Sequence, residues 1–226
     1  MTGRRSDLNH RKRGVDMKVY NLQLGELRSN CYVIETAPGR CVAVDIGGDS
    51  RLLVEFLRMK KLSLRKILLT HGHFDHIGGA EEVHKATGAE VYIHSEDVPM
   101  LTSESLSLAS SISIRQFVPL TDWTAIYGDS YINDGDCTFR VLHTPGHTKG
   151  SVCYVCEDAL FSGDTLFCCS CGRTDFLGGS PDEMRRSLEI LYGLDGDYKV
   201  YPGHNETSTL DYERRANPYM KEFRNK

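Results

Sequence analysis

The chain has 226 residues, of which 40% are hydrophobic and 26% charged, and its net charge is −4. That length fits one domain with a sizeable core, and the composition excludes a disordered or fibrous protein. The apolar runs are too short to cross a bilayer and the N-terminus shows no signal peptide, so we expect a cytoplasmic protein with no membrane partner.

The first 16 residues differ from the rest in charge. They hold five basic and two acidic residues and few apolar ones, whereas a strand-like run starts just after Met17. We therefore expect a flexible basic extension over residues 1–16 and one folded domain over 17–226. The remainder is more acidic than the whole chain, which argues against a nucleic-acid partner.

The first half of the chain predicts alternating strands and helices. Runs of β-branched and aromatic residues between turn residues indicate strands, and leucines at helical spacing indicate helices. The expected elements are strands at 18–22, 30–35 and 40–45, a helix over 52–57, a strand at 66–70, a helix over 80–86 that ends at Gly88, and a strand at 91–94.

The second half continues this order, with strands expected at 139–142, 151–161 and 199–201. Ser180, Pro181 and Glu183 form a capping box with proline at the first helical position, which predicts a helix start. The serine-rich segment 100–116 suits either a helix packed over the site or a mobile loop. Strands alternating with helices predict sheet layers covered by helices.

Eight cysteines are present, and we expect them to be reduced thiols, because the chain is long and lacks an export signal. Cys153 and Cys156 lie in a strand-like run, where their side chains would point to opposite faces. Cys168, Cys169 and Cys171 are crowded together. A structural metal needs four ligands at loop spacing, so we do not expect one at these cysteines.

Three of the nine histidines fall within the segment His71-Gly72-His73-Phe74-Asp75-His76, directly after an expected strand. His71 and His73 lie two positions apart and can both face one metal ion. Asp75 and His76 are adjacent and project away from that pair, toward a second ion. Imidazole and carboxylate ligands suit zinc, iron or manganese, so the segment predicts a metal site rather than a solvated loop.

Three more metal-competent side chains, His147, Asp164 and His204, each follow an expected strand. Each alone is a weak signal, because a single histidine in a turn is more often structural. Their recurrence at strand ends predicts that they complete the same site. Seven ligands are too many for one tetrahedral ion, so we expect two divalent metal ions, zinc first, with iron or manganese as alternatives.

These motifs, in this order, resemble the metallo-β-lactamase superfamily over nearly the whole chain from Met17. The resemblance implies a four-layer αββα sandwich (an α/β fold) with the metals at one edge of the sheets. It implies a supporting role for Asp45 behind the ligand loop. It also implies one metal held by His71, His73 and His147, another held by Asp75, His76 and His204, and Asp164 bridging the two.

Within that superfamily the chain resembles the single-domain glyoxalase II-like (hydroxyacylglutathione hydrolase-like) enzymes, through the segments 30–32, 172–176 and 212–218. The implied activity is hydrolysis of a small thioester by a hydroxide held at a dinuclear site, with Asp75 and Asp164 at the catalytic centre. Arg173 would grip a substrate carboxylate. The alternative for Arg173 is a structural pair with Asp175.

Two rivals belong to the same superfamily. A mononuclear-iron persulfide dioxygenase shares the Gly-Arg-Thr-Asp-Phe stretch. Its first motif, however, usually has alanine where this chain has Phe74, and its last motif has Asp-Tyr where this chain has Asn205-Glu206. A tRNA-processing nuclease is disfavoured by the acidic body. We therefore expect a small-molecule thioester substrate and no nucleic acid.

Overall fold

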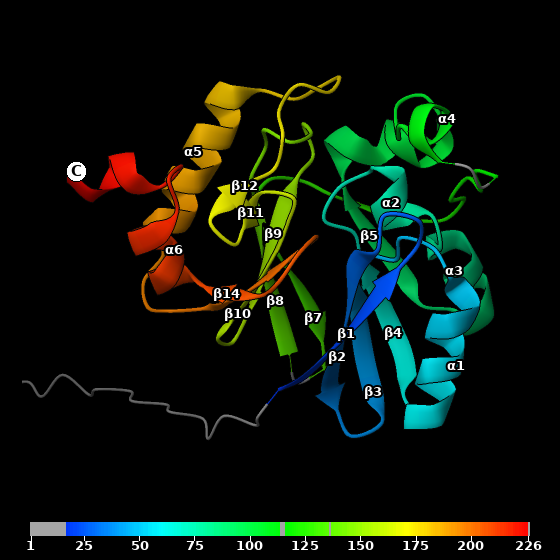
Figure 1. Cartoon of the computed structure of the whole chain (residues 1–226). Helices are drawn as coiled ribbons and strands as arrows, with labels where there is room; N and C mark the ends of the chain where they lie inside the picture. The colour runs from blue at the N-terminus through cyan, green and yellow to red at the C-terminus, as the bar shows by residue number, and fades with distance from the viewer. Residues whose placement is uncertain (1–16, 114–115, 136, 226) are drawn as a thin grey trace, which may run out of the picture.

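The computed structural model describes residues 17–113, 116–135 and 137–225, so the extension expected over 1–16 lies outside the described residues. Two six-stranded sheets face each other, with helices on their outer faces (Figure 1). This is the expected αββα sandwich. Among the residues that the structure describes, no helix has both the length and the apolar character that a bilayer crossing requires.

The first sheet has the strand order β1-β2-β3-β4-β5-β6 and the second has the order β14-β13-β10-β9-β8-β7. The first consists of β1 (Lys18–Leu24), β2 (Ser29–Ala37), β3 (Arg40–Val44), β4 (Ser63–Leu68), β5 (Glu90–His94) and β6 (Thr124–Ile126). The second consists of β7 (Ser130–Asp134), β8 (Cys137–His143), β9 (Val152–Cys156), β10 (Ala159–Gly163), β13 (Lys199–Pro202) and β14 (Ser208–Thr209).

The helices cover both outer faces, and a small hairpin stands apart from the large sheets. The helices are α1 (Ser50–Lys60), α2 (Phe74–Ile77), α3 (Ala80–Thr87), α4 (Ala109–Ile112), α5 (Pro181–Tyr192) and α6 (Leu210–Ala216), with 3-10 helices η1 (Ser95–Thr102) and η2 (Lys221–Asn225). The hairpin joins β11 (Leu166–Phe167) to β12 (Ser170–Cys171). In Figure 1, α1 and α3 flank the first sheet and α5 and α6 flank the second.

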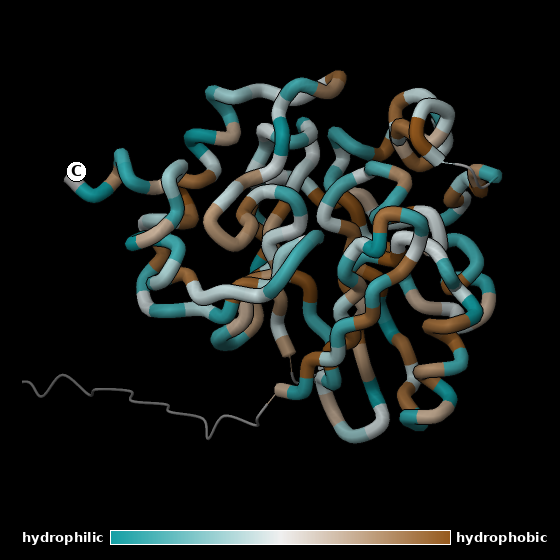
Figure 2. The backbone as a smooth tube through the Cα atoms, in the orientation of Figure 1, coloured by the Kyte–Doolittle hydropathy of each residue, from teal (hydrophilic) through white to brown (hydrophobic). Residues whose placement is uncertain are grey.

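The strands β2, β3, β9 and β10 are buried on both faces, which is why their sequences are largely apolar. In β2, Cys31 and Val33 pack under the helices, whereas Tyr32 and Ile34 enter the core between the sheets. Figure 2 shows hydrophobic residues concentrated along the central strands and hydrophilic ones along the outer turns. The core therefore has three layers of side chains, one between the sheets and one beneath each set of helices.

Several local predictions are confirmed. The helix α3 ends against Gly88, whose left-handed backbone (φ 71°) caps it. Ser180 caps α5 and accepts a hydrogen bond from the Glu183 amide. Cys153 and Cys156 do lie on opposite faces of β9, one beneath α5 and the other between the sheets.

Three regions differ from expectation. The run expected to be a strand over 151–161 is divided by a turn at 157–158 into the antiparallel strands β9 and β10. The strand expected at 66–70 ends at Leu68, because the Thr70 amide donates to the Asp45 carboxylate instead of a neighbouring strand. The segment 100–116 forms neither a long helix nor a simple loop: it holds the end of η1 and the short α4. It packs on the ligand loop, because the Phe74 amide donates to the Ser107 carbonyl over 2.9 Å.

The sheet topology brings several strand ends to one edge of the sandwich. Strands β8 and β10 both pair antiparallel with β9, and β10 is parallel to β13, so β8, β10 and β13 end at the same edge. In the other sheet β3 and β4 are parallel and end beside each other. Hydrogen bonds join the two sheets here: Tyr154 Oη donates to the Leu69 carbonyl at 2.7 Å and Tyr32 Oη donates to the Pro202 carbonyl at 2.8 Å.

Candidate metal centre

The seven side chains expected to form the site converge at this edge. The loop after β4 and the short helix α2 supply four of them, and the loops after β8, β10 and β13 supply one each. His73 is the N-cap of α2 and is still extended (φ −70°, ψ 147°), whereas Asp75 and His76 are helical. This change of backbone conformation sends the two pairs of side chains in different directions.

The first group is His71, His73 and His147, whose ligand nitrogens lie within 4.8 Å of one another. His73 Nδ1 is 2.9 Å from His147 Nε2. Burial, reinforced by the neighbouring imidazoles, lowers the pKa of His71 well below its ordinary value and that of His73 to about 3. Both rings are therefore neutral at physiological pH, which is the form that ligates a metal.

The second group is Asp75, His76 and His204, whose ligand atoms also lie within 4.8 Å of one another. His204 Nε2 is 3.1 Å from Asp75 Oδ2 and 3.3 Å from His76 Nε2. Burial alone would raise the pKa of the Asp75 carboxyl, but His76 and His204 hold it well below its usual range. The carboxylate is thus ionised and faces two imidazoles.

Asp164 lies between the two groups. Its Oδ2 is 3.5 Å from His147 Nε2 and 3.6 Å from His204 Nε2, and its Oδ1 is 3.4 Å from His76 Nε2. Gly203 permits this approach, because a Cβ there would collide with Asp164 Oδ1. One carboxylate oxygen therefore contacts both groups, and the other points at the second group.

The centre fits divalent metal ions. Within the described part of the chain, the buried atoms His71 Nε2 and Asp164 Oδ1 have no hydrogen-bond partner. Buried polar atoms are nearly always paired, so an unpaired imidazole nitrogen and an unpaired carboxylate oxygen within one cluster of ligand atoms fit a bound cation. Neutral imidazoles with carboxylates are the ligand chemistry of zinc, iron and manganese.

Asp45 supports the ligand loop from behind, as the resemblance implied. Its Oδ2 lies 2.8 Å from His76 Nδ1 and accepts from Thr70 Oγ1 at 2.7 Å. Burial alone would lower the pKa of His76, but Asp75, Asp164 and Asp45 raise it well above its ordinary value. The hydrogen bond to Asp45 fixes the ring so that Nε2 faces the centre.

Asp97 is a supporting residue that the sequence analysis missed. Its buried carboxylate accepts from the Gly72 amide at 2.9 Å, from Thr148 Oγ1 at 2.7 Å and from the Gly150 amide at 2.8 Å. It therefore joins the His71–His73 segment to the His147 loop. No local motif marks Asp97, because all three partners are distant in sequence.

Arg173 lies at the rim of the centre. Its guanidinium is half exposed and pairs with both carboxylate oxygens of Asp175 at 2.6 Å. It also stacks over the Phe176 ring at 3.9 Å, and that ring meets His73 edge-on with centroids 5.8 Å apart. Arg173 therefore pairs with Asp175, which was the alternative to binding a substrate carboxylate, and it lies near the first histidine group.

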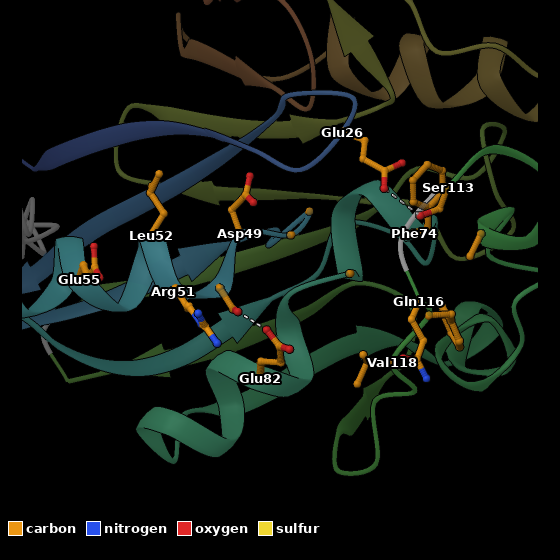
Figure 3. A pocket seen from close by; sticks show the side chains of 16 residues that line it. Glu26, Asp49, Arg51, Leu52, Glu55, Phe74, Glu82, Ser113, Gln116 and Val118 are labelled. Atoms are coloured by element: carbon orange, nitrogen blue, oxygen red, sulfur yellow. Dashed lines mark hydrogen bonds between the residues drawn. The ribbon is translucent and has the colours of Figure 1, made fainter.

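Two cavities lie close to the centre. One, of about 640 Å³, borders Phe74 on the outer side of α2 and is lined partly by Glu26, Arg51 and Glu82 (Figure 3). The other, of about 530 Å³, lies beside Arg173 between α5 and the segment 218–222. Among the residues that the structure describes, none of the seven side chains of the candidate metal centre lines either cavity. The second cavity shares Gly172 and Arg173 with the rim of the centre.

Comparison with known proteins identifies the family. A family model of the metallo-beta-lactamase superfamily matches residues 24–204, and the chain belongs to this superfamily. It is 32% identical over 210 residues to the probable metallo-hydrolase YqgX of Bacillus subtilis, covering 92% of this chain and 99% of that protein. It is 30% identical over 210 residues to the hydroxyacylglutathione hydrolase GloC of Haemophilus influenzae, covering 90% and 98%.

Solved structures agree with this assignment. The B3 metallo-beta-lactamase BLEG-1 superposes with a TM-score of 0.86 at 33% identity, covering 90% of this chain and 99% of that one. TTHA1623 in a di-iron-bound form gives 0.78 at 33% identity, covering 89% and 100%. ETHE1 from Myxococcus xanthus gives 0.74 at 26% identity, covering 89% and 84%. The expected fold and superfamily are therefore confirmed.

Proposed function

We propose that the protein is a metal-dependent hydrolase that cleaves a small thioester at a dinuclear centre. The observation that carries this proposal is the position of Asp164, whose carboxylate faces both three-residue groups. A carboxylate between two ligand sets is what a two-metal site requires, and a one-metal site would leave the second set without a purpose.

In this proposal His71, His73 and His147 hold one ion, and Asp75, His76 and His204 hold the other. Asp164 contributes to both. Two divalent ions at these residues would polarise a carbonyl and lower the pKa of bound water. Zinc is the proposed metal, and iron is the first alternative, because the similar TTHA1623 is described in a di-iron-bound form.

The protein's own groups have separate tasks. Asp45 and Asp97 hold the ligand loops in place, so that the imidazoles need no reorganisation when substrate arrives. Arg173 would exchange its exposed pair with Asp175 for a substrate carboxylate, because bidentate recognition of one carboxylate suits another. A thiolate leaving group has a pKa near 8.5, so the site needs no strong general acid.

The names of two similar proteins and one stretch of this sequence define the substrates to test. GloC is named a hydroxyacylglutathione hydrolase, which supports a 2-hydroxyacyl thioester. BLEG-1 is a B3 metallo-beta-lactamase, so a chromogenic cephalosporin belongs in the panel. The persulfide dioxygenase suggested by the Gly172–Phe176 stretch requires a persulfide and oxygen. The intact αββα body with an acidic net charge supports a small-molecule substrate and no nucleic acid.

The test is metal exchange with two readouts. Zinc-loaded and iron-loaded protein would each be given a lactoyl thioester of glutathione, a cephalosporin and a glutathione persulfide, with thiol release and oxygen uptake recorded. The proposal expects thiol release by the zinc form without oxygen consumption. Oxygen uptake confined to the iron form, with no thiol release from any thioester, would identify a dioxygenase instead. Cleavage of the cephalosporin alone would identify a lactamase.

A further inference from the structure

A second group of metal-binding side chains lies outside the centre described above. Cys168 and Cys169 occupy the turn between β11 and β12, and Glu213 lies on α6 (Figure 1). One Sγ from each cysteine and one carboxylate oxygen of Glu213 lie within 4.8 Å of one another. All eight cysteines are among the described residues, and none of them is in a disulfide.

The turn itself brings the two thiols together. Phe167 pairs with Ser170, so Cys168 and Cys169 are the two loop residues of the hairpin. Cys169 has φ 53°, in the left-handed region that glycine and asparagine adopt most easily. A cysteine there costs on the order of 1 kcal/mol. In an extended strand adjacent side chains point to opposite faces, whereas this turn brings both thiols within 4.8 Å of a Glu213 carboxylate oxygen.

Glu213 is fully buried, and its hydrogen-bond donors are neutral. Its Oε2 accepts from the Cys169 amide and from Asn217 Nδ2, each at 2.8 Å, and its Oε1 accepts from Ser208 Oγ. Within the described ranges, no basic side chain forms an ion pair with it. A buried carboxylate without a cation is costly, so this position favours a positive charge.

The Cys168 thiol lies close to this buried carboxylate. Burial, followed by the negative charge of Glu213, raises the pKa of Cys168 to about 11. Without a metal this cysteine therefore stays a neutral thiol beside a buried carboxylate. An ion at this point would favour the thiolate and compensate Glu213 at once.

We propose that Cys168, Cys169 and Glu213 bind one thiophilic divalent ion such as Zn²⁺, at a site separate from the histidine-rich centre. Each thiol loses its proton to solvent when its Sγ–metal bond forms, and Glu213 binds through an ionised oxygen. Zn–S and Zn–O bonds of about 2.3 and 2.1 Å place tetrahedral ligands about 3.5 Å apart, which a small side-chain rotation reaches from the observed spacing.

The ion at this site would be exchangeable. Three protein ligands leave a fourth position open, and Cys169 is exposed to solvent. The hairpin also adjoins the other centre, because the Phe167 ring meets His204 edge-on with centroids 6.1 Å apart. The two sites therefore need a readout that tells them apart.

Sulfur provides that readout, because none of the seven side chains of the other centre is a cysteine. Reduced full-length protein, treated briefly with a chelator to remove exchangeable zinc, would be titrated with Co²⁺, and the near-ultraviolet thiolate-to-cobalt charge-transfer absorption recorded. We expect the band to saturate at about one ion per chain, in keeping with a single three-ligand site. Release of bound Co²⁺ by a chelator should abolish it.

Variants locate the site. Cys168→Ser and Cys169→Ser should each weaken binding at least about tenfold, since a serine hydroxyl is a poor ligand for a soft metal. Cys137→Ser, which changes a comparably half-buried cysteine in β8, should leave the band unchanged. Unchanged circular dichroism would show that the turn variants are folded. Absence of a thiolate band, or a band that survives in the Cys168→Ser/Cys169→Ser double variant, would overturn the proposal whatever the protein hydrolyses.

Discussion

Asp97 Oδ2 accepts a hydrogen bond from Thr148 Oγ1 at 2.7 Å and so joins the two loops that carry the first histidine group. The same carboxylate binds the Gly72 and Gly150 amides. Burial of an ionised group with three donors is favourable only while all three bonds hold.

The first prediction is that Asp97→Asn destabilises the protein. Asparagine presents an NH₂ group to donors that need an acceptor, and hydrogen bonds to charged groups contribute about 1.5–3 kcal/mol each. We expect the free energy of unfolding to fall by about 3 kcal/mol in urea titrations and zinc affinity to fall roughly 10- to 100-fold. The exposed neighbour Glu96→Gln is the control and should change neither. Equal stability and equal zinc affinity in both variants would show that Asp97 does not stabilise the ligand loops.

The second prediction concerns Asp45, which binds both Thr70 and the far side of His76. Asp45→Asn can keep the left-handed backbone (φ 55°) but loses the charge that orients the ring. We expect the affinity for the metal ion bound by His76 to fall roughly 10- to 100-fold. The affinity for the ion bound by the first histidine group should fall less. Competition with a chelator, followed by metal analysis, measures this loss. Asp122→Asn, at an exposed carboxylate, is the control; equal loss of both ions would show that Asp45 does not act through His76.

The third prediction separates the two readings of Arg173. If the guanidinium binds a substrate carboxylate, Arg173→Met should raise KM for a carboxylate-bearing thioester by roughly 10- to 100-fold and leave kcat within about twofold. The free energy of unfolding should stay unchanged within experimental error, because the pair with Asp175 is exposed to solvent. Arg185→Met, which breaks an equally exposed pair with Glu222, is the matched control. Identical kinetics in both variants would leave Arg173 a purely structural residue.

The fourth prediction tests the helix that covers the second sheet. Ser180 accepts from the Glu183 amide at the start of α5, so Ser180→Ala should cost about 1 kcal/mol of unfolding free energy. Ser110→Ala, at an exposed position of α4, should stay within about 0.5 kcal/mol of the parent. Thermal or urea unfolding of the three proteins measures the difference, and a neutral Ser180→Ala would show that the capping hydrogen bond contributes little.

The sequence was enough to predict which seven side chains come together at one edge of the sandwich, and the reason is local. His71, His73, Asp75 and His76 are close in sequence, and the other three candidates follow strands whose hydrophobic runs are easily read. The αββα sandwich was predicted from the resemblance to the superfamily, because apolar strands and capped helices alone fit several layered folds.

Contacts between residues far apart in the chain could not be predicted from the sequence. Ser29, whose hydroxyl donates to Asp75 Oδ2 at 2.9 Å, and Asp97 contact the centre through partners 25 to 53 residues away, and no spacing rule identifies such pairs. The sequence analysis expected no metal at Cys168 and Cys169, because Glu213, the third side chain of the proposed site, lies 44 residues beyond Cys169 and joins them only in three dimensions. Short strands such as β6 and β7 were missed because their few residues carry little periodicity.

The dinuclear centre with Asp164 between two ligand groups is tested most directly by the metal-to-protein ratio of three proteins. Metal-replete parent, Asp75→Ala and Asp164→Ala would be stripped of loose ions on a chelating column and measured by elemental analysis. We expect about two ions per chain in the parent, about one in Asp75→Ala and close to none in Asp164→Ala, because the Asp164 carboxylate faces both groups. One ion in the parent, retained by Asp75→Ala, would contradict the dinuclear centre.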